Sequence, residues 1–295
     1  MQRTLLAVIA LLFCMVVLSF LGQIFPIGDS LAVARLPLLV IILLLTFFIN
    51  LNPFLRILML GVCVTIFEMS VSVTSELAVI EVPKELQALR IYQKNLLISE
   101  GSIEKVIEDG IALKTDVFAL QEVDKDAKQS VTSLLPEDWG VISCMGSGDF
   151  GLMLISRVQI QFTDAECETG KGYLLGKITH NNQEILLGSL HLHWPFPFEQ
   201  PEQVPQILKI LSDLDYPVII GADLNMVPWG SVAKRISESM NGAFHVPSET
   251  TYNSPVDVIS LPIDYVLTPK VQSVEIAKRP LYGSDHFGLL ATIHF

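Results

Sequence analysis

Eight polar side chains that follow or interrupt short apolar runs could carry chemistry in this chain. In chain order they are Asn95, Glu122, His191, Asp223, Asn225, Asp264, Asp285 and His286. The apolar runs have the length and composition of buried strands, so each strand would deliver an oxygen ligand or an imidazole to a common rim. Hard cations such as Mg²⁺ bind carboxylate and carbonyl oxygens and keep water and substrate phosphate as further ligands. The pattern predicts a divalent-metal site that cleaves phosphate esters.

Asp223 and Asn225 follow the apolar run 218–221. In extended backbone their side chains would leave the same face, because residues two apart point to one side of a strand. The carboxylate could then take a proton from water while the amide holds that water or a metal ion. The competing interpretation is an Asx-type turn that ends the strand, since Asp and Asn favour turns.

Asp264 interrupts an apolar run, and a half-buried carboxylate needs a hydrogen-bonding partner. His286 could be that partner, because an Asp–His pair holds the ring in one tautomer and makes it a better base or phosphate contact. Asp285 offers an oxygen ligand on the adjacent residue. Glu122 ends another apolar run, a position that would by itself also suit a surface glutamate.

His191 and His193 alternate at the end of one expected strand, and either could bind phosphate or protonate a leaving oxygen. A lone strand histidine is more often a satisfied core residue, so the pattern leaves the choice between the two open. Asn95 also ends an expected strand. It could orient metal or phosphate, or simply cap the chain.

The elements that must position these residues are short strands alternating with a few amphipathic helices. Strands are expected at 89–94, 116–121, 150–156, 173–179, 184–191, 217–222, 263–268 and 286–294. Helices are expected at 102–114, capped by Ser102, and at 204–214, with Pro205 in the first turn. Many strands with helices outside them predict an α/β fold with two packed sheets. Residues 81–295 suffice for one domain with a sizeable core.

Residues 1–80 differ sharply in composition from the rest. They carry three basic and three acidic residues, so the remaining residues carry the whole net charge of −12. Apolar runs at about 5–25, 33–51 and 57–77 predict two to three helices that cross a ~30 Å hydrocarbon core. Arg35 is placed to snorkel to the membrane surface. Glu68 makes the third run the weakest candidate, because a carboxylate near the membrane centre is costly.

Orientation rests on Arg3 and Arg56, which the positive-inside rule places in the cytoplasm together with the N-terminus. Three spans would put residues 81–295 outside the cytoplasm, and two would leave them inside. Cys144 and Cys167 could form a disulfide in an oxidising compartment, but two cysteines alone do not decide this. The sequence therefore predicts a multi-pass membrane protein whose first helices contact the lipid bilayer, and it indicates no protein partner.

Taken in order, the strings around the polar residues resemble the endonuclease/exonuclease/phosphatase superfamily. They are Asn95, 119–123, 151–157, 190–192, 221–225, 263–267 and 283–287. The resemblance covers roughly residues 88–295. It implies a four-layer α/β sandwich, in which helices flank two central β-sheets, and Mg²⁺-dependent cleavage of phosphate esters, with Mn²⁺ as an alternative metal.

The same resemblance implies a metal site and a role for one arginine. Glu122 matches the metal-binding glutamate, Asn95 the asparagine beside it, and Asp285 a further metal-site carboxylate. Arg157 matches an arginine to which we assign no role.

The resemblance also implies the catalytic groups. Asp223 and Asn225 match the pair that activates or positions the attacking water. Asp264 with His286 resembles the pair at the scissile phosphate, and His191 matches the histidine of the family's Thr-His-Leu-like motif. The chain has Ala222 where the family usually has glycine.

The expected reaction is in-line attack of water on a phosphodiester or phosphomonoester. The substrate would be a nucleic acid or a phospholipid or phosphoinositide head group. The acidic domain lacks the basic footprint of a tight duplex binder, and a membrane tether favours a lipid head group. A membrane-tethered binding protein that lost catalysis is the alternative, although the complete set of polar residues argues against it.

Overall fold

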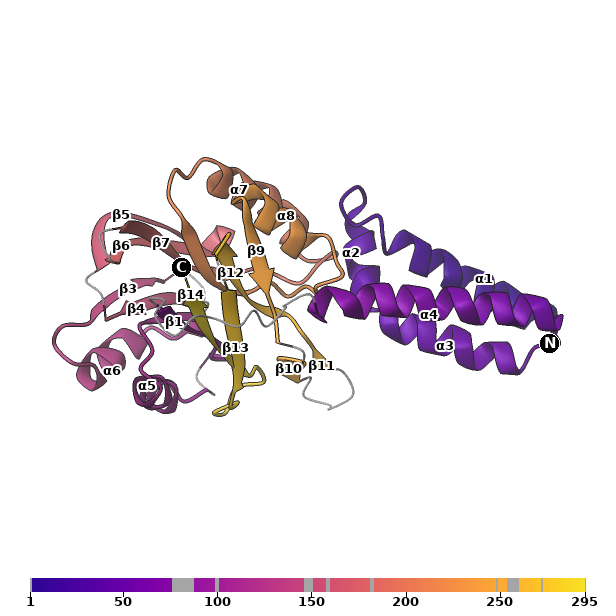
Figure 1. The fold of residues 1–295 in the computed structure, drawn as a ribbon, viewed down its shortest axis with the longest axis horizontal. Helices are drawn as coiled ribbons and strands as arrows, with labels where there is room; N and C mark the ends of the chain where they lie inside the picture. Colours follow the sequence, from indigo (N-terminus) through magenta and orange to yellow (C-terminus); the bar gives the residue numbers. More distant parts are fainter. Residues whose placement is uncertain are drawn as a thin grey trace.

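The computed structural model describes residues 2–75, 88–98, 101–145, 151–157, 160–180, 183–247, 249–253, 260–271 and 273–294. Four helices come first in the described chain: α1 (Gln2–Leu18), α2 (Pro26–Val33), α3 (Arg35–Phe47) and α4 (Pro53–Ser75). They extend from one side of a β-rich body (Figure 1). The composition boundary near Glu81 lies outside the described residues.

Two six-stranded sheets form the β-rich body. The first has the order β13-β14-β1-β2-β4-β3 and the second β5-β6-β7-β8-β12-β9. Strands of the first sheet are β1 (Ala88–Asn95), β2 (Val117–Val123), β3 (Gly140–Cys144), β4 (Gly151–Ser156), β13 (Ser273–Arg279) and β14 (Gly288–His294). Strands of the second are β5 (Ile160–Glu168), β6 (Tyr173–His180), β7 (Gln183–His191), β8 (Val218–Asp223), β9 (Gly242–His245) and β12 (Asp264–Pro269). A small separate ladder joins β10 (Tyr252–Asn253) to β11 (Ser260–Leu261).

Helices cover the outer faces of both sheets, as the sequence predicts. α5 (Ile103–Ala112) and α6 (Ala127–Leu134) cover the first sheet, while α7 (Gln200–Ser212) and α8 (Val232–Ser239) cover the second. One apolar cluster fills the space between the sheets, and another lies under each helix pair. The body is therefore an α/β fold in which two mixed sheets pack on each other and helices flank them.

The eight predicted strands are all present, but several elements were missed. In the described part of the two large sheets, the four missed strands β3, β5, β9 and β13 are the edge strands. An edge strand has a neighbour on one side only and needs no continuous apolar run, so it leaves a weak pattern. The two-turn helices α6 and α8 were missed too. Ser102 does cap α5, but α7 begins at Gln200, so Pro205 lies inside the helix rather than in its first turn.

The first helices differ from the two to three spans predicted at about 5–25, 33–51 and 57–77. α1 ends at Leu18 rather than near residue 25, and α2 and α3 meet at an angle of 64°. Within the described residues, one helix is long and apolar enough to cross a membrane, Pro53–Ser72, or two if the bent α2–α3 pair counts as one span. The third run, the weakest candidate by sequence, is thus the longest of the four helices. Glu68 lies about two turns from its end and is exposed, rather than at its centre.

Arg35 does not snorkel outward as predicted. Its side chain is buried, and its guanidinium donates to the Ser19 hydroxyl at 2.7 Å and the Ser19 carbonyl at 2.7 Å. A longer hydrogen bond of 3.4 Å reaches Ser70, and the guanidinium also lies 3.9 Å from the centre of the Phe20 ring. The residue ties α3 to the end of α1 and to α4, because local hydrogen-bond acceptors satisfy it better than the bundle surface would.

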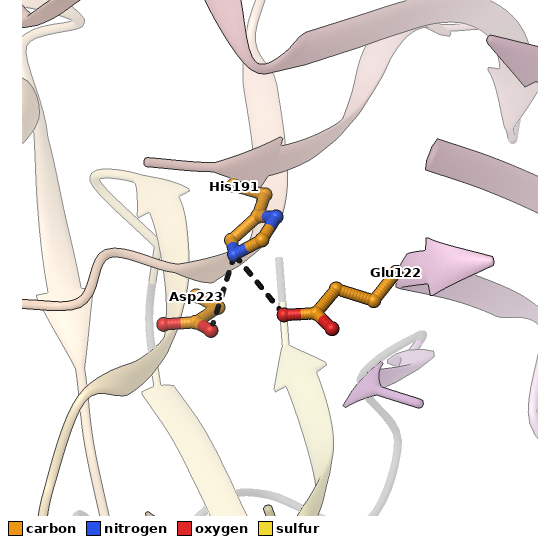
Figure 2. A group of neighbouring side chains, drawn as sticks. All are labelled: Glu122, His191 and Asp223. Carbon is orange, nitrogen blue, oxygen red and sulfur yellow. Dashed lines mark ion pairs between the residues drawn. The ribbon is translucent and has the colours of Figure 1, made fainter. Parts of the chain in front are cut away.

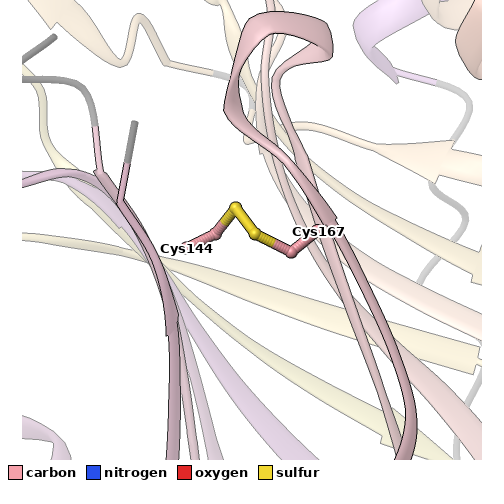
Figure 3. Close-up of a disulfide and its surroundings, with 2 residues drawn as sticks. All are labelled: Cys144 and Cys167. Atoms are coloured by element: carbon pink, nitrogen blue, oxygen red, sulfur yellow. A yellow bond between two sulfur atoms is a disulfide. The ribbon is translucent and has the colours of Figure 1, made fainter. Parts of the chain in front are cut away.

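A disulfide joins Cys144 on β3 to Cys167 on β5 (Figure 3). The two strands are edge strands of different sheets, so the bond crosslinks the two sheets on one side of the body. Sequence spacing alone left this pairing open.

Candidate active site

Strand register brings the ends of β7, β8 and β12 into one row. β7 runs parallel to β8 and pairs His191 with Asp223, whereas β12 runs antiparallel and pairs Asp264 with Asp223. In the opposite sheet, parallel β1 and β2 pair Asn95 with Gln121, the residue before Glu122. Parallel neighbours end at the same edge of a sheet, which is why residues far apart in sequence meet here.

Two site residues have unusual backbone conformations. Glu122 has φ 53° where the register of β2 against β4 shifts, and Asn225 has φ 47° just after β8. A β-bulge re-aims a side chain, and strained backbone of this kind concentrates at functional sites. The bulge lets both Gln121 and Glu122 face polar neighbours.

The two sheets approach each other closely below the site. A Cβ on Gly221 would lie 2.6 Å from the Cβ of Ala119. Glycine at this position therefore permits the sheets to bring their polar ends within hydrogen-bonding reach.

Asn95 bridges the two sheets through its amide nitrogen. That nitrogen donates to Glu122 Oε1 and to Asp223 Oδ2, each at 2.9 Å. His191 Nε2 lies 3.6 Å from each of the same two oxygens (Figure 2). Burial lowers the pKa of His191, although Glu122 opposes this, so the ring is held neutral.

Asp264 and His286 form a buried pair. His286 Nδ1 lies 2.9 Å from Asp264 Oδ2, and His286 Nε2 lies 3.7 Å from Asp223 Oδ2. Burial by itself would lower the pKa of His286, but Asp264 and Asp223 outweigh it and raise that pKa to about 9. Burial would raise the pKa of Asp264, but the charge and hydrogen bond of His286 lower it. The pair therefore presents an imidazolium to the site.

Asp223 is the other strongly perturbed carboxyl group. It is fully buried, and burial raises its pKa to about 7, against the opposing effect of His286. Its second oxygen accepts from the Asn225 N–H at 2.9 Å. This contact is an Asx-type turn, so the extended backbone that would align both side chains is absent. The Asn225 amide still turns back to the Leu192 carbonyl, at 2.8 Å, and approaches His191 Nε2 at 3.5 Å.

Three further candidates lie at different distances from this centre. Asp285 is at its rim, with Oδ1 3.9 Å from His286 Nε2. His193 instead faces Glu199 at 3.7 Å and is half exposed. Arg157 follows the end of β4 that is farther from Glu122, and it pairs there with Asp116. It therefore lies at the opposite end of the sheet from the site.

Several residues that support the site had no predicted role. Gln93 donates to Asp264 at 2.9 Å and to Gln121 at 3.0 Å, and all three are fully buried. Lys94 is also buried and donates to the backbone carbonyls of Leu281 and His286, which fixes the loop that carries His286. Polar residues within otherwise apolar strands were the available signal.

The described residues contain two groups that could hold a metal ion. Glu122, His191 and Asp223 form one, and Asp223, Asp264 and His286 the other, with ligand atoms within 4.8 Å of one another in each. Asp285 Oδ1 is buried, and no described residue donates a hydrogen bond to it. A buried carboxylate oxygen without a donor needs a cation or water, so the donor set fits a hard divalent ion.

The model of the "Endonuclease/Exonuclease/phosphatase family" matches residues 87–286. The chain belongs to this family. Its members are typically metal-dependent hydrolases of phosphate esters, which agrees with the acidic and histidine groups described above. A search of curated proteins finds no match.

Solved structures of the family share the fold of this chain. A humanised TDP2 of D. rerio is 16% identical and has a TM-score of 0.56, covering 70% of this chain and 99% of that one. The family protein of Bacteroides vulgatus is 14% identical with a TM-score of 0.58, covering 71% and 99%. The human Nocturnin catalytic domain, solved with sulfate, is 17% identical with a TM-score of 0.52, covering 70% and 94%. At these identities the likeness concerns the fold alone.

Proposed function

We propose that this family member is a membrane-anchored, metal-dependent phosphoesterase that cleaves a phosphate ester by in-line attack of water. One observation carries the proposal: Glu122, Asp223 and His286 meet at one end of the two sheets, within reach of one another. Asp223 Oδ2 lies 3.7 Å from His286 Nε2, and Asn95 holds that oxygen beside Glu122.

The chain's own residues divide the chemistry between them. Asp223 would accept the water proton, because a pKa of about 7 suits a general base at neutral pH. Asn225 would orient the water. His286, charged by Asp264, would stabilise negative charge on the phosphoryl oxygens.

The metal would be held by Glu122, with Asn95 beside it and Asp285 at the rim of the site, and His191 and Asp223 lie within reach of the same ion. We expect Mg²⁺, with Mn²⁺ as the alternative, since oxygen-rich donor sets suit these ions. Such an ion, when bound, supplies positive charge to the phosphoryl oxygens. Asn95 would hold Glu122 and Asp223 in position for it.

Two substrate classes are supported, each by a different observation. A D. rerio TDP2 structure holds a single-strand DNA product, which supports a nucleic acid. The acidic composition of the body and its apolar helices support a phospholipid or phosphoinositide head group. Between these we favour the lipid head group, since the −12 charge opposes a polyanion.

The location proposed is a membrane with the catalytic body outside the cytoplasm. Gln2 Nε2 donates to the Asn50 carbonyl at 3.0 Å, so the N-terminus and the α3–α4 turn share one end of the bundle. α2 contacts the body at the other end. Three crossings would separate the N-terminus from the body, and the Cys144–Cys167 disulfide supports an oxidising compartment.

The test uses the full chain in detergent with Mg²⁺, with Mn²⁺ or with a chelator. Substrates are bis(4-nitrophenyl) phosphate, single-stranded DNA, phosphatidylinositol phosphates and sphingomyelin. We expect hydrolysis that the chelator abolishes and that Asp223→Ala and His286→Ala reduce at least ~10²-fold. His193→Ala is the matched control, since it removes a half-exposed imidazole two residues after His191, outside the cluster of site residues. Absence of hydrolysis with every substrate would favour the catalytically silent binding protein.

A separate test addresses the compartment. Protease added to intact cells should digest the body only if it lies outside the cytoplasm. Protection that persists until the membrane is permeabilised would reject three crossings.

A further inference from the structure

A cleft lies between the α1–α2 turn and helices α7 and α8. Its walls combine apolar groups, from Ile24 of the turn and from Pro195, Pro201 and Val204 of the body, with polar groups of similar extent. Arg235 of α8 also lines it. The cleft is distinct from the catalytic centre, because none of the clustered carboxylates and histidines lines it.

Arg235 is the cationic side chain of the cleft. Among the described residues, no hydrogen bond or ion pair of its guanidinium is present. Asp29 of α2 also lines the cleft, and it accepts from the Ser231 N–H at 2.8 Å and the Ser231 hydroxyl at 2.7 Å. The Gln200 amide likewise donates to backbone carbonyls at 2.6 and 2.9 Å.

The cleft opens where the helical bundle meets the body. Trp229 Nε1 donates to the Ala32 carbonyl at 2.8 Å, and Ser30 donates to the Phe196 carbonyl at 2.5 Å, so α2 lies directly on the body (Figure 1). Large apolar side chains near this junction are exposed: Ile24 69%, Phe25 52%, Phe196 48% and Phe198 56%. Apolar side chains exposed at the end of a membrane bundle are typical of contact with the lipid interface.

We propose that this cleft binds one phospholipid molecule, with its phosphate on Arg235 and its glycerol and first acyl carbons against the apolar walls. A guanidinium binds phosphate through two parallel hydrogen bonds. Ile24 and Pro195 of the cleft wall are followed in sequence by the exposed Phe25 and Phe196, which suits an acyl chain and not a free phosphate ion. The inference rests on the proposed membrane location of the bundle, but it does not require catalysis.

The experiment is native mass spectrometry of the delipidated full chain in detergent, with chelator, titrated with phosphatidylglycerol. We expect one tightly held lipid per chain. Arg235→Gln should weaken its binding about 10- to 100-fold, the range for loss of a charge-assisted hydrogen-bond pair. Ile24→Ser should weaken it as well. Ile24 is an exposed residue of the turn, so its substitution tests the apolar wall without disturbing the packing of the core.

The matched control is Lys234→Gln. Lys234 is the preceding residue of α8, its side chain is 73% exposed, and it pairs with Glu238 at 3.7 Å. The substitution removes the same charge from the same helix outside the cleft, so lipid binding should be unchanged.

Two further ligands separate the contribution of the phosphate to binding from that of the acyl chains. Diacylglycerol has the acyl chains without phosphate, and glycerol phosphate has the phosphate without acyl chains. Both should bind far more weakly than phosphatidylglycerol. Equal binding of either one, or wild-type binding by Arg235→Gln, overturns the proposal.

Failure here is distinguishable from failure of the proposed function. Arg235→Gln should hydrolyse the soluble chromogenic diester at the wild-type rate, whereas Asp223→Ala should keep the lipid. A chain that holds lipid through Arg235 but hydrolyses nothing would reject the phosphoesterase alone. A chain that hydrolyses the diester but holds lipid independently of Arg235 would reject the cleft alone.

Discussion

Asp264→Asn should change the pH dependence of hydrolysis, and not only its rate. Asp264 is fully buried and is the main group that raises the pKa of His286 to about 9. The asparagine keeps an oxygen that can accept from Gln93, but it removes the negative charge that holds the imidazolium. The pKa of His286 should then fall toward its ordinary ~6.5.

The magnitude follows from the protonated fraction of His286. At pH 7.5 a group with a pKa of ~9 is ~97% protonated, and one with a pKa of ~6.5 is ~9% protonated. Protonation alone should therefore cost the variant about tenfold in rate at this pH. Loss of the charged hydrogen bond adds about 10- to 100-fold at every pH. The rate of the variant should therefore fall about 10²- to 10³-fold below the wild type at pH 7.5. Near pH 5.5, where His286 of the variant is again protonated, this deficit should be about tenfold smaller.

The assay is hydrolysis of bis(4-nitrophenyl) phosphate at saturating Mg²⁺ between pH 5.5 and 8.5, with the variant-to-wild-type ratio plotted against pH. Taking the ratio removes the pH dependence of groups common to both proteins. Asp116→Asn is the control, because Asp116 is a largely buried carboxylate that pairs with Arg157 at the opposite end of the sheet. It should give a flat ratio. A flat ratio for Asp264→Asn as well would refute the assignment of His286 as a cation held by Asp264.

Three other outcomes are expected. Glu122→Gln should raise the Mg²⁺ concentration needed for half-maximal rate about 10- to 100-fold, with partial rescue at high Mg²⁺, as measured by metal titration; an unchanged requirement would remove Glu122 from the metal site. Replacing Cys144 and Cys167 together by serine should cost about 3 kcal/mol of stability, because the disulfide closes a loop with a separation of 23 residues. The melting temperature should fall by about 6–12 °C. A calorimetric melt without any shift would contradict this. In chelator, the pKa of His286 is higher in the folded state than in the unfolded state, so protonated His286 stabilises the fold by at most ~3 kcal/mol. This contribution is complete below pH ~6.5 and is lost as the pH rises through about 9. Denaturant melts should show that decline in the wild type and a much flatter curve in His286→Ala.

The sequence by itself determined the central strands and most of the polar residues that share the candidate site. Buried central strands need continuous apolar runs, and a hard-cation site needs carboxylates where those runs end, so both leave local patterns. Eight strands and the ordered polar residues were therefore predictable. The family followed from the same strings, because their order along the chain is specific even where each one is weak.

Only the tertiary structure decided which polar residues share one centre. His191 and His193 have the same local pattern, and the pairing of His191 with Asp223 across β7 and β8 brings one of them to the cluster. The bulge at Glu122 depends on the partner strand β4, which lies about 30 residues away in the chain. Arg157 was matched by its string, yet β4 carries it to the far end of the sheet. Edge strands, the burial of Arg35 and the Cys144–Cys167 bond likewise depend on contacts between distant segments, and such contacts leave little trace in the local order of residues.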